Sequence, residues 1–359
     1  MKRNPWIVAA VVCFLAVGSA FAEAEIHRSF SFRPGDTLEI ETERGDIEYH
    51  SVGGSELTLT IRAKNGDVED YLDLEFDDRD GVRIKGVSTG KGFSFLSSLF
   101  GGGGDGGSIQ FVINGPEHVD LIFSTSGGDI VIIDDIDGSV TLATSGGDIA
   151  VNDIDGSVTL TTSGGDITFS DIRGSLKAGT SGGNILGASV SGASSLATSG
   201  GDIRLQRADA DLKVGTSGGD IELGEVGGWL KARTSGGGIE VMRARGDVKV
   251  STSGGDIVLE EMEGFVEARS SGGRMEIEFA PGNHHGGDLS ASGGDLNVRL
   301  PRGVGFDLDA DADGGEVRAV LPVETEGRRD GHRLRGTIAG GGNLLKLRNN
   351  NGDIVITDG

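Results

Sequence analysis

Apolar and polar residues alternate along most of this chain, and from about residue 125 the pattern returns every eighteen residues after one spacing of nineteen. In each repeat two apolar residues stand two positions apart, as Ile167 and Phe169 do, and a second alternating pair follows a glycine. Period-two alternation is typical of strands that bury one face. Each repeat is therefore predicted to hold two short strands and two turns. The first strands begin at Ile130, Ile149, Ile167, Ile185, Ile203, Ile221, Ile239, Ile257 and Met275.

The motif TSGGDI, as in Thr144–Ile149, marks the turn before each first strand and recurs through the series unchanged or with few substitutions. We expect the glycine pair to supply positive φ at a tight corner. We expect the hydroxyl groups to form ladders that satisfy backbone groups at the corner, and the aspartate to cap the turn in the same way.

A unit of this kind cannot bury its apolar face alone, whereas stacked copies share one core. The sequence therefore predicts an all-β fold, a parallel β-solenoid with 18-residue coils that rise by about 4.8 Å each. We expect a right-handed β-helix from the general preference of crossover connections. The left-handed hexapeptide helix also has eighteen residues per coil, but its apolar anchors lie six apart, and here the gaps are unequal.

Residues 1–22 are predicted to be a signal peptide. Lys2 and Arg3 precede the apolar run 6–17, and residues 20–22 form a small-x-small cleavage site. We expect an exported protein, either periplasmic or extracellular at the cell surface. Since Cys13 is removed with the signal, the mature chain has no cysteine for a disulfide, a thiol nucleophile or a thiolate metal site.

Three further regions follow. Residues 23–120 are predicted to be a strand-rich N-terminal cap, 121–280 the regular repeats, and 281–359 an irregular C-terminal cap. The cap contains a Gly- and Ser-rich loop, 86–108, which is either a plain excursion or an apolar tip that touches a partner or a membrane surface. Its apolar residues are Phe93, Phe95, Leu96, Leu99 and Phe100.

Net charge and composition exclude several classes of binding partner and of fold. The net charge is -24, so nucleic acid and anionic lipid are poor partners, whereas divalent cations and basic partners suit the chain. With 65 glycines and only 6 prolines the chain is too rich in glycine for a helical protein, and its glycines do not follow the collagen period. No segment of the mature chain is apolar enough to span a membrane, and the sequence predicts no oligomeric state.

The chain resembles the bacterial putative-adhesin family of secreted β-strand-repeat proteins (domain of unknown function 4097). The resemblance rests on the repeated TSGGDI strands, the lead-in FVINGPEHVDLIFSTSGGDI and the closing GTIAGGGNLLKLRNNNGDIVIT. It covers most of the chain after the signal and implies a β-strand-repeat solenoid with an adhesive role. It carries over no catalytic residues and no cofactor.

One column of aspartates follows the glycine pairs and is the candidate metal site. Carboxylates about 4.8 Å apart repel by roughly 1–3 kcal/mol per neighbouring pair, so something must offset the repulsion. Either each aspartate caps a turn, or calcium bridges the coils, since Ca²⁺ binds several carboxylate oxygens. Asn184, Gly238 and Arg274 interrupt the column, which favours turn capping. The candidates are Asp129, Asp148, Asp166, Asp202, Asp220 and Asp256.

A column of lysines on the second strand, Lys177, Lys213, Lys231 and Lys249, is the candidate binding face. The first strand carries outward glutamates, so one face is expected to be basic and the other acidic. The column is either ordinary solvated surface or a face that binds an anionic polysaccharide or another envelope polymer.

The sequence gives little indication of an enzyme, because none of the six histidines lies in the regular repeats. His284 and His285 are adjacent in a loop and are expected to point apart. We predict a non-enzymatic envelope or extracellular scaffold with adhesin-like binding to an envelope, polysaccharide or protein partner. The alternatives are a calcium- or anionic-polysaccharide-binding module and a β-helix enzyme acting on glycans. A contiguous basic or aromatic stripe would favour the binding module, and an acid–base pair in a pocket at a rod end would favour the enzyme.

Overall fold

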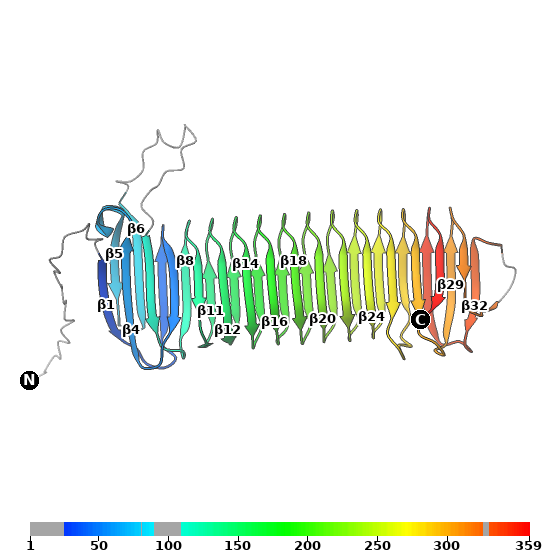
Figure 1. The fold of residues 1–359 in the computed structure, drawn as a ribbon, viewed down its shortest axis with the longest axis horizontal. Coiled ribbons are helices and arrows are strands. Elements are labelled where there is room, and N and C mark those ends of the chain that lie inside the picture. The colour runs from blue at the N-terminus through cyan, green and yellow to red at the C-terminus, as the bar shows by residue number, and fades with distance from the viewer. Residues whose placement is uncertain (1–24, 80, 90–108, 326–329) are drawn as a thin grey trace, which may run out of the picture.

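The computed structural model describes residues 25–79, 81–89, 109–325 and 330–359. These residues form a straight rod of two long sheets that face each other across one core (Figure 1). In the described part of the chain the only helix is α1 (Val68–Tyr71). The predicted all-β parallel solenoid is thus confirmed. The predicted signal peptide and residues 90–108 of the predicted loop lie outside the described residues, while Gly86 belongs to a strand.

Each regular coil contributes one strand to each sheet. Sheet A is built from the strands that follow the TSGGD corner, and sheet B from the strands that follow the second turn. In this region sheet A contains β9 (Ile130–Ile133), β10 (Ile136–Asp137), β12 (Ile149–Asp155), β14 (Ile167–Ile172), β16 (Ile185–Val190), β18 (Ile203–Ala208), β20 (Ile221–Val226), β22 (Ile239–Ala244), β24 (Ile257–Met262), β26 (Met275–Phe279) and β28 (Leu296–Leu300). Sheet B contains β8 (Asp120–Thr125), β11 (Val140–Ala143), β13 (Val158–Thr161), β15 (Leu176–Gly179), β17 (Ser194–Ala197), β19 (Leu212–Gly215), β21 (Leu230–Arg233), β23 (Val248–Thr252), β25 (Val266–Ser270) and β27 (Gly287–Ala291).

Neighbouring coils pair in parallel, with equivalent residues opposite one another. Ile149 lies opposite Ile167, and Ile203 lies opposite Ile221, so the eighteen-residue spacing predicted from sequence is the pairing register. Inward residues of both sheets are buried and outward residues are half-buried or exposed. Register is strongly specified here because a slip of one residue would turn the apolar set outward.

The TSGGD corner is joined to its neighbours through the threonine hydroxyl. In a typical coil the Oγ1 of Thr162 donates to the carbonyl oxygen of Gly147 in the preceding coil at 2.9 Å and accepts the N–H of Gly165 at 3.3 Å. The threonines of this column are 2–8% exposed. From Thr144 to Thr252 each hydroxyl therefore satisfies two backbone groups that the corner would otherwise bury unpaired. The predicted hydroxyl ladder is confirmed for the threonines of the motif.

The predicted reason for the glycine pair is wrong, because none of the pairs from Gly127-Gly128 to Gly272-Gly273 has positive φ. The second glycine is required by stacking instead. A Cβ on Gly147 would lie 2.0 Å from the carbonyl oxygen of Gly128 one coil back, and the same clash returns at 1.9–2.1 Å in every regular coil. The first glycine is less constrained, since a Cβ on Gly146 would meet nothing closer than 3.8 Å.

We predict that Gly147→Ala lowers the free energy of unfolding by more than about 2 kcal/mol, because neighbouring backbones must separate to admit the methyl group. Gly146→Ala, its matched control one residue away, should change it by less than about 0.5 kcal/mol. Urea denaturation followed by circular dichroism measures both. Equal effects of the two substitutions would contradict the stacking explanation.

In one coil a glycine interrupts the column of inward apolar residues of sheet A, and a large side chain in the preceding coil fills the space. Gly187 occupies an inward position that Val151, Phe169 and Leu205 fill in nearby coils. A Cβ on Gly187 would lie 2.2 Å from Cζ of Phe169, so the phenyl ring occupies the space that the glycine leaves empty. The large and the small residue form one packing unit, which keeps the core dense.

We predict that Phe169 and Gly187 are energetically coupled. Gly187→Leu should cost about 1–3 kcal/mol by overpacking against the ring, and Phe169→Leu should cost a similar amount by leaving a cavity. The double substitution should be more stable than the sum of the two, with a coupling of about 0.5–3 kcal/mol, because it restores the leucine stacking seen at Leu205 and Leu223. Additive costs in a double-mutant cycle would exclude the compensation.

The rod ends contain coils that are out of chain order. At the N-terminal end are β1 (Glu25–Ser31), β2 (Thr37–Thr42), β3 (Asp46–Ser51), β4 (Glu56–Ala63), β5 (Leu72–Asp77), β6 (Val82–Ser88) and β7 (Ile109–Gly115). Strand β2 lies between β6 and β8, and β3 lies between β7 and β9. The first coil of the chain is thus enclosed by later ones (Figure 1). Antiparallel β4, β1 and β5 cover it outside.

The C-terminal end repeats this arrangement. It contains β29 (Phe306–Ala312), β30 (Val317–Ala319), β31 (Glu324–Thr325), β32 (Arg333–Ile338), β33 (Asn343–Asn349) and β34 (Ile354–Asp358). Strand β33 lies between β27 and β29, and β34 lies between β28 and β30. Asn349 replaces the corner threonine there, since its amide donates to Gly294 and accepts the N–H of Gly352.

Candidate functional site

The aspartate column lies in one line along the TSGGD corner and is used for coil-to-coil bonding. The Oδ1 of Asp148 accepts the N–H of Asp166 at 2.7 Å, and the Oδ1 of Asp202 accepts the N–H of Asp220 at 2.9 Å. The same bond recurs along the column at 2.6–3.0 Å, and Asn184 makes it with its amide oxygen. Each side chain thus satisfies a backbone donor in the next coil, which offsets carboxylate repulsion.

The same geometry limits what the column offers a metal ion. Gly238 has no side chain, and Arg274 places a guanidinium 3.4 Å from Oδ2 of Asp256. Within the described residues no group of three or more His, Cys, Asp or Glu side chains is arranged to hold a metal ion. Calcium binding at Asp129, Asp148, Asp166, Asp202, Asp220 and Asp256 remains a prediction.

We predict that Asp220→Asn changes the free energy of unfolding by less than about 0.5 kcal/mol, because an amide oxygen still accepts the N–H of Gly238 as Asn184 does for Asp202. Asp220→Ala should cost about 1–3 kcal/mol, because that N–H loses its acceptor. Thermal unfolding measured with and without calcium distinguishes a role in hydrogen bonding between coils from a role in calcium binding. A calcium-dependent rise in Tm that Asp220→Asn abolishes would favour a metal site.

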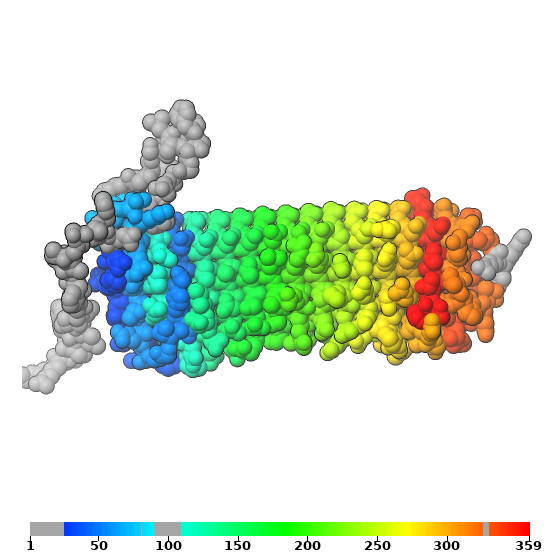
Figure 2. Space-filling view, viewed as in Figure 1, coloured from blue at the N-terminus to red at the C-terminus, as the bar shows by residue number. Residues whose placement is uncertain are grey.

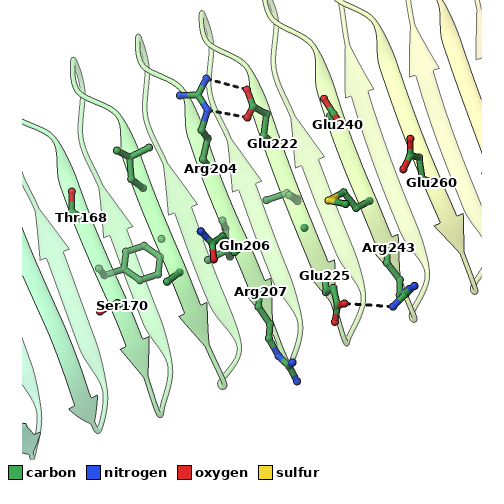
Figure 3. Close-up of a pocket in the computed structure, with 18 of the residues that line it drawn as sticks. Thr168, Ser170, Arg204, Gln206, Arg207, Glu222, Glu225, Glu240, Arg243 and Glu260 are labelled. Atoms are coloured by element: carbon green, nitrogen blue, oxygen red, sulfur yellow. Dashed lines mark hydrogen bonds and ion pairs between the residues drawn. The ribbon is translucent and has the colours of Figure 1, made fainter.

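The outer face of sheet A has a shallow groove of about 960 Å³ that runs across strands β14 to β24. Figure 3 shows Gln206 in the middle of the groove, with longer charged side chains such as Arg204 on one side and Arg207 on the other. Gly224 deepens the floor, since it has no side chain.

Ion pairs between coils neutralise the cations along this groove. The guanidinium of Arg204 contacts Glu222 at 2.9 and 3.0 Å, and Arg243 pairs with Glu225 at 3.4 Å (Figure 3). Arg243 also pairs with Glu261. The hydrogen bond with Glu222 raises the pKa of Arg204 above its usual value. The predicted outward glutamates lie on this sheet: Glu222, Glu240 and Glu276. Since its arginines are paired, sheet A offers an anion no free cation here.

Sheet B carries the predicted lysine column on its outer face. Lys213 lies opposite Lys231, and Lys231 lies opposite Lys249, on three adjacent strands. Lys177 is two coils away, separated from Lys213 by Ser195. The structure therefore brings together three of the four predicted lysines in direct register.

Most of these cations lack a protein partner. Of the column, only Lys249 forms an ion pair, at 2.6 Å with Glu267, which also pairs with Arg269. The hydrogen bond from Lys249 lowers the pKa of Glu267 below its usual value. Lys213 and Lys231 are described residues with no ion pair or side-chain hydrogen bond, so their ammonium groups face solvent.

Three features of sheet B were not predicted from sequence. Arg233 extends the cationic surface beside Lys231, and Trp229, which is 44% exposed, immediately precedes β21. Phe265 repeats this placement two coils on, 37% exposed. Gly215 stands next to Lys213 on the outward face. Part of this was available in the sequence, because Arg233 and Gly215 lie two positions after Lys231 and Lys213, and a strand places such positions on one face.

The histidines do not assemble a catalytic pair. His284 and His285 were expected to point apart, but their rings stack with centroids 4.6 Å apart. They line a corner pocket of about 350 Å³ together with Glu261 and Glu263. No carboxylate oxygen lies within 4.0 Å of a ring nitrogen of either histidine in the described structure, so no carboxylate is placed to exchange a proton with them.

Comparison with protein families gives one match. Residues 230–357, about a third of the chain, match the family model described as Toastrack DUF4097, which is the family that the sequence motifs resemble. Among curated proteins none matches the chain. The described residues contain no helix long and apolar enough to cross a membrane.

Solved structures with related descriptions are remote. A putative cell adhesion protein from Clostridium sporogenes is 8% identical, with a TM-score of 0.20, and the match covers 94% of this chain and all of that one. A putative adhesin from Parabacteroides distasonis is 12% identical, with a TM-score of 0.26, and 94% and 98% of the two chains are covered. A putative adhesin from Bacteroides fragilis is 13% identical at a TM-score of 0.22 with the same coverage.

Proposed function

We propose that this protein is an exported, non-enzymatic scaffold of the cell envelope or cell exterior that binds its partner through the faces of the rod. The observation that carries the proposal is the regularity of the outer surface. Every central coil presents equivalent outward positions on two sheets, and the rod keeps an even outline along its length (Figure 2). Many equal sites on one rigid body suit multivalent attachment to an extended partner.

The arrangement of polar groups supports binding over catalysis. The grooves on sheet A are shallow and their arginines are neutralised by neighbouring glutamates, as Arg204 is by Glu222. The corner aspartates are occupied with backbone N–H groups. A hydrolase or lyase requires an acid and a base positioned together, and the stacked histidines His284 and His285 have no such neighbour in the described residues.

We predict that residues 23–359 sediment with cell-envelope fractions, and that chelation of calcium leaves most of this sedimentation intact, because the aspartate column already bonds within the protein. The measurement is co-sedimentation with and without calcium, with an unrelated acidic protein as the control for trapping.

The outcome of the co-sedimentation experiment distinguishes the alternatives. Sedimentation that requires calcium would favour the aspartate column as the binding element and support the calcium-binding alternative. Failure to sediment in both conditions would overturn the proposal that the rod attaches to the envelope.

A further inference from the structure

We propose that the outer face of sheet B from β15 to β25 is a binding surface for a linear polysaccharide that carries carboxylates and lies along the rod axis. This surface, called the lysine lane below, deepens the proposed function by naming the chemical class of the partner. It rests on four independent features of sheet B: charge, spacing, exposed backbone and aromatic side chains.

The charge of the lane is opposite to that of the whole chain. Between β15 and β25 the outward strand positions hold six cations and one carboxylate, Glu267, on a protein of net charge -24. Lys213 and Lys231 repel each other in direct register, yet no carboxylate among the described residues pairs with either. An external anion would complete this arrangement. The six cations are Lys177, Lys213, Lys231, Arg233, Lys249 and Arg269.

The spacing of the lane fits a sugar polymer. Lys213, Lys231 and Lys249 lie on adjacent strands, so their stems are spaced by about 4.8 Å along the rod. A pyranose residue in an extended chain advances by nearly the same length. A polymer with one carboxylate per sugar, laid across the strands, therefore brings one anionic group to each coil.

The lane also has glycines that the fold does not require. Gly179 and Gly215 are the last residues of β15 and β19, where they still pair with neighbouring strands, and neither has positive φ. A Cβ on Gly215 would meet its nearest atom at 3.8 Å and one on Gly179 at 3.9 Å, so both positions have room for a side chain. Thr161 and Ser251 occupy the equivalent place in other coils. The bare backbone leaves a shelf beside the lysines where a ligand can approach closely.

Aromatic side chains border the same surface. Trp229 and Phe265 each stand two positions before an outward residue of the lane, Lys231 and Glu267 respectively, and both are exposed. Between them Asp247 accepts the N–H of Phe265 through Oδ1, so this carboxylate is engaged with the corner. Exposed aromatic faces pack against the C–H faces of sugars, which distinguishes a polysaccharide from a simple polyanion.

The primary test is binding of polygalacturonate to residues 23–359, measured by isothermal titration calorimetry at two salt concentrations. Replacing Lys213, Lys231 and Lys249 by Gln should weaken binding about tenfold and reduce its dependence on salt. The matched control removes three cations from the opposite face by replacing Arg204, Arg207 and Arg243 with Gln, and should bind as the unaltered protein does. Neutral dextran should not bind.

Two further variants, which leave the charge unchanged, distinguish specific binding at the lysine lane from a general effect of charge. Gly215→Thr should keep or raise Tm but weaken binding of polygalacturonate, because the side chain covers the shelf; a purely structural glycine would give a lower Tm instead. Trp229→Ala should weaken binding while leaving the salt dependence unchanged, since it removes sugar packing and no charge.

Several outcomes would overturn the inference. Equal loss of binding in the sheet A control would show a non-specific charge effect. Polyglutamate that binds as tightly as polygalacturonate, with no effect of Trp229→Ala, would assign the surface to polyanions other than sugars. Envelope sedimentation that survives the triple lysine substitution would overturn the lane while leaving the proposed scaffold role intact, whereas loss of sedimentation in that variant alone supports both.

Discussion

The close approach of one coil to the next is the constraint on which this molecule depends. Strand pairing sets the spacing between coils, and at each TSGGD corner that spacing leaves no room for a Cβ between Gly147 and the carbonyl oxygen of Gly128. The threonine hydroxyl and the aspartate carboxylate then satisfy the backbone groups that such a tight corner exposes or buries. The motif is therefore a set of side chains selected for contact between coils rather than for the conformation of a single turn.

The sequence predicted the parts of the structure that repeat. Period-two alternation and the eighteen-residue spacing specify strands, faces and register, because a solenoid converts chain period directly into spatial alignment. The purpose of Gly147 was not predictable, since the clash that requires it comes from a residue in another coil. Gly187 was visible only as a gap in a column; its explanation, the ring of Phe169, needed the packed core. The enclosed end coils break the relation between chain order and spatial order, and no local signal marks them.

The candidate surface was predictable to a similar extent. The lysine column is periodic and was found from sequence, but the absence of partners for Lys213 and Lys231 follows only from the packed structure. Because inward and corner positions are dictated by stacking, the outward positions are the part of each repeat that is free to vary without loss of the fold. Sheet A uses that freedom for charge pairs such as Arg204 with Glu222, whereas sheet B gathers cations. One repeat thus supports two faces with different chemistry.

The displaced coils at the two ends give the rod an order of assembly. Strands β33 and β34 follow β29 and β30 in the chain but lie inside them in the stack. Strands β27 and β29 are therefore not paired with each other, and β33 connects them only after it has been synthesised. During synthesis a nascent rod therefore keeps a vacant slot between two formed coils. When β33 and β34 enter this gap, they complete the strand pairing of both sheets together. Unfolding that begins at the C-terminus of the chain must first extract β34 and β33, which are paired on both sides, so these strands resist fraying more than strands paired on one side would.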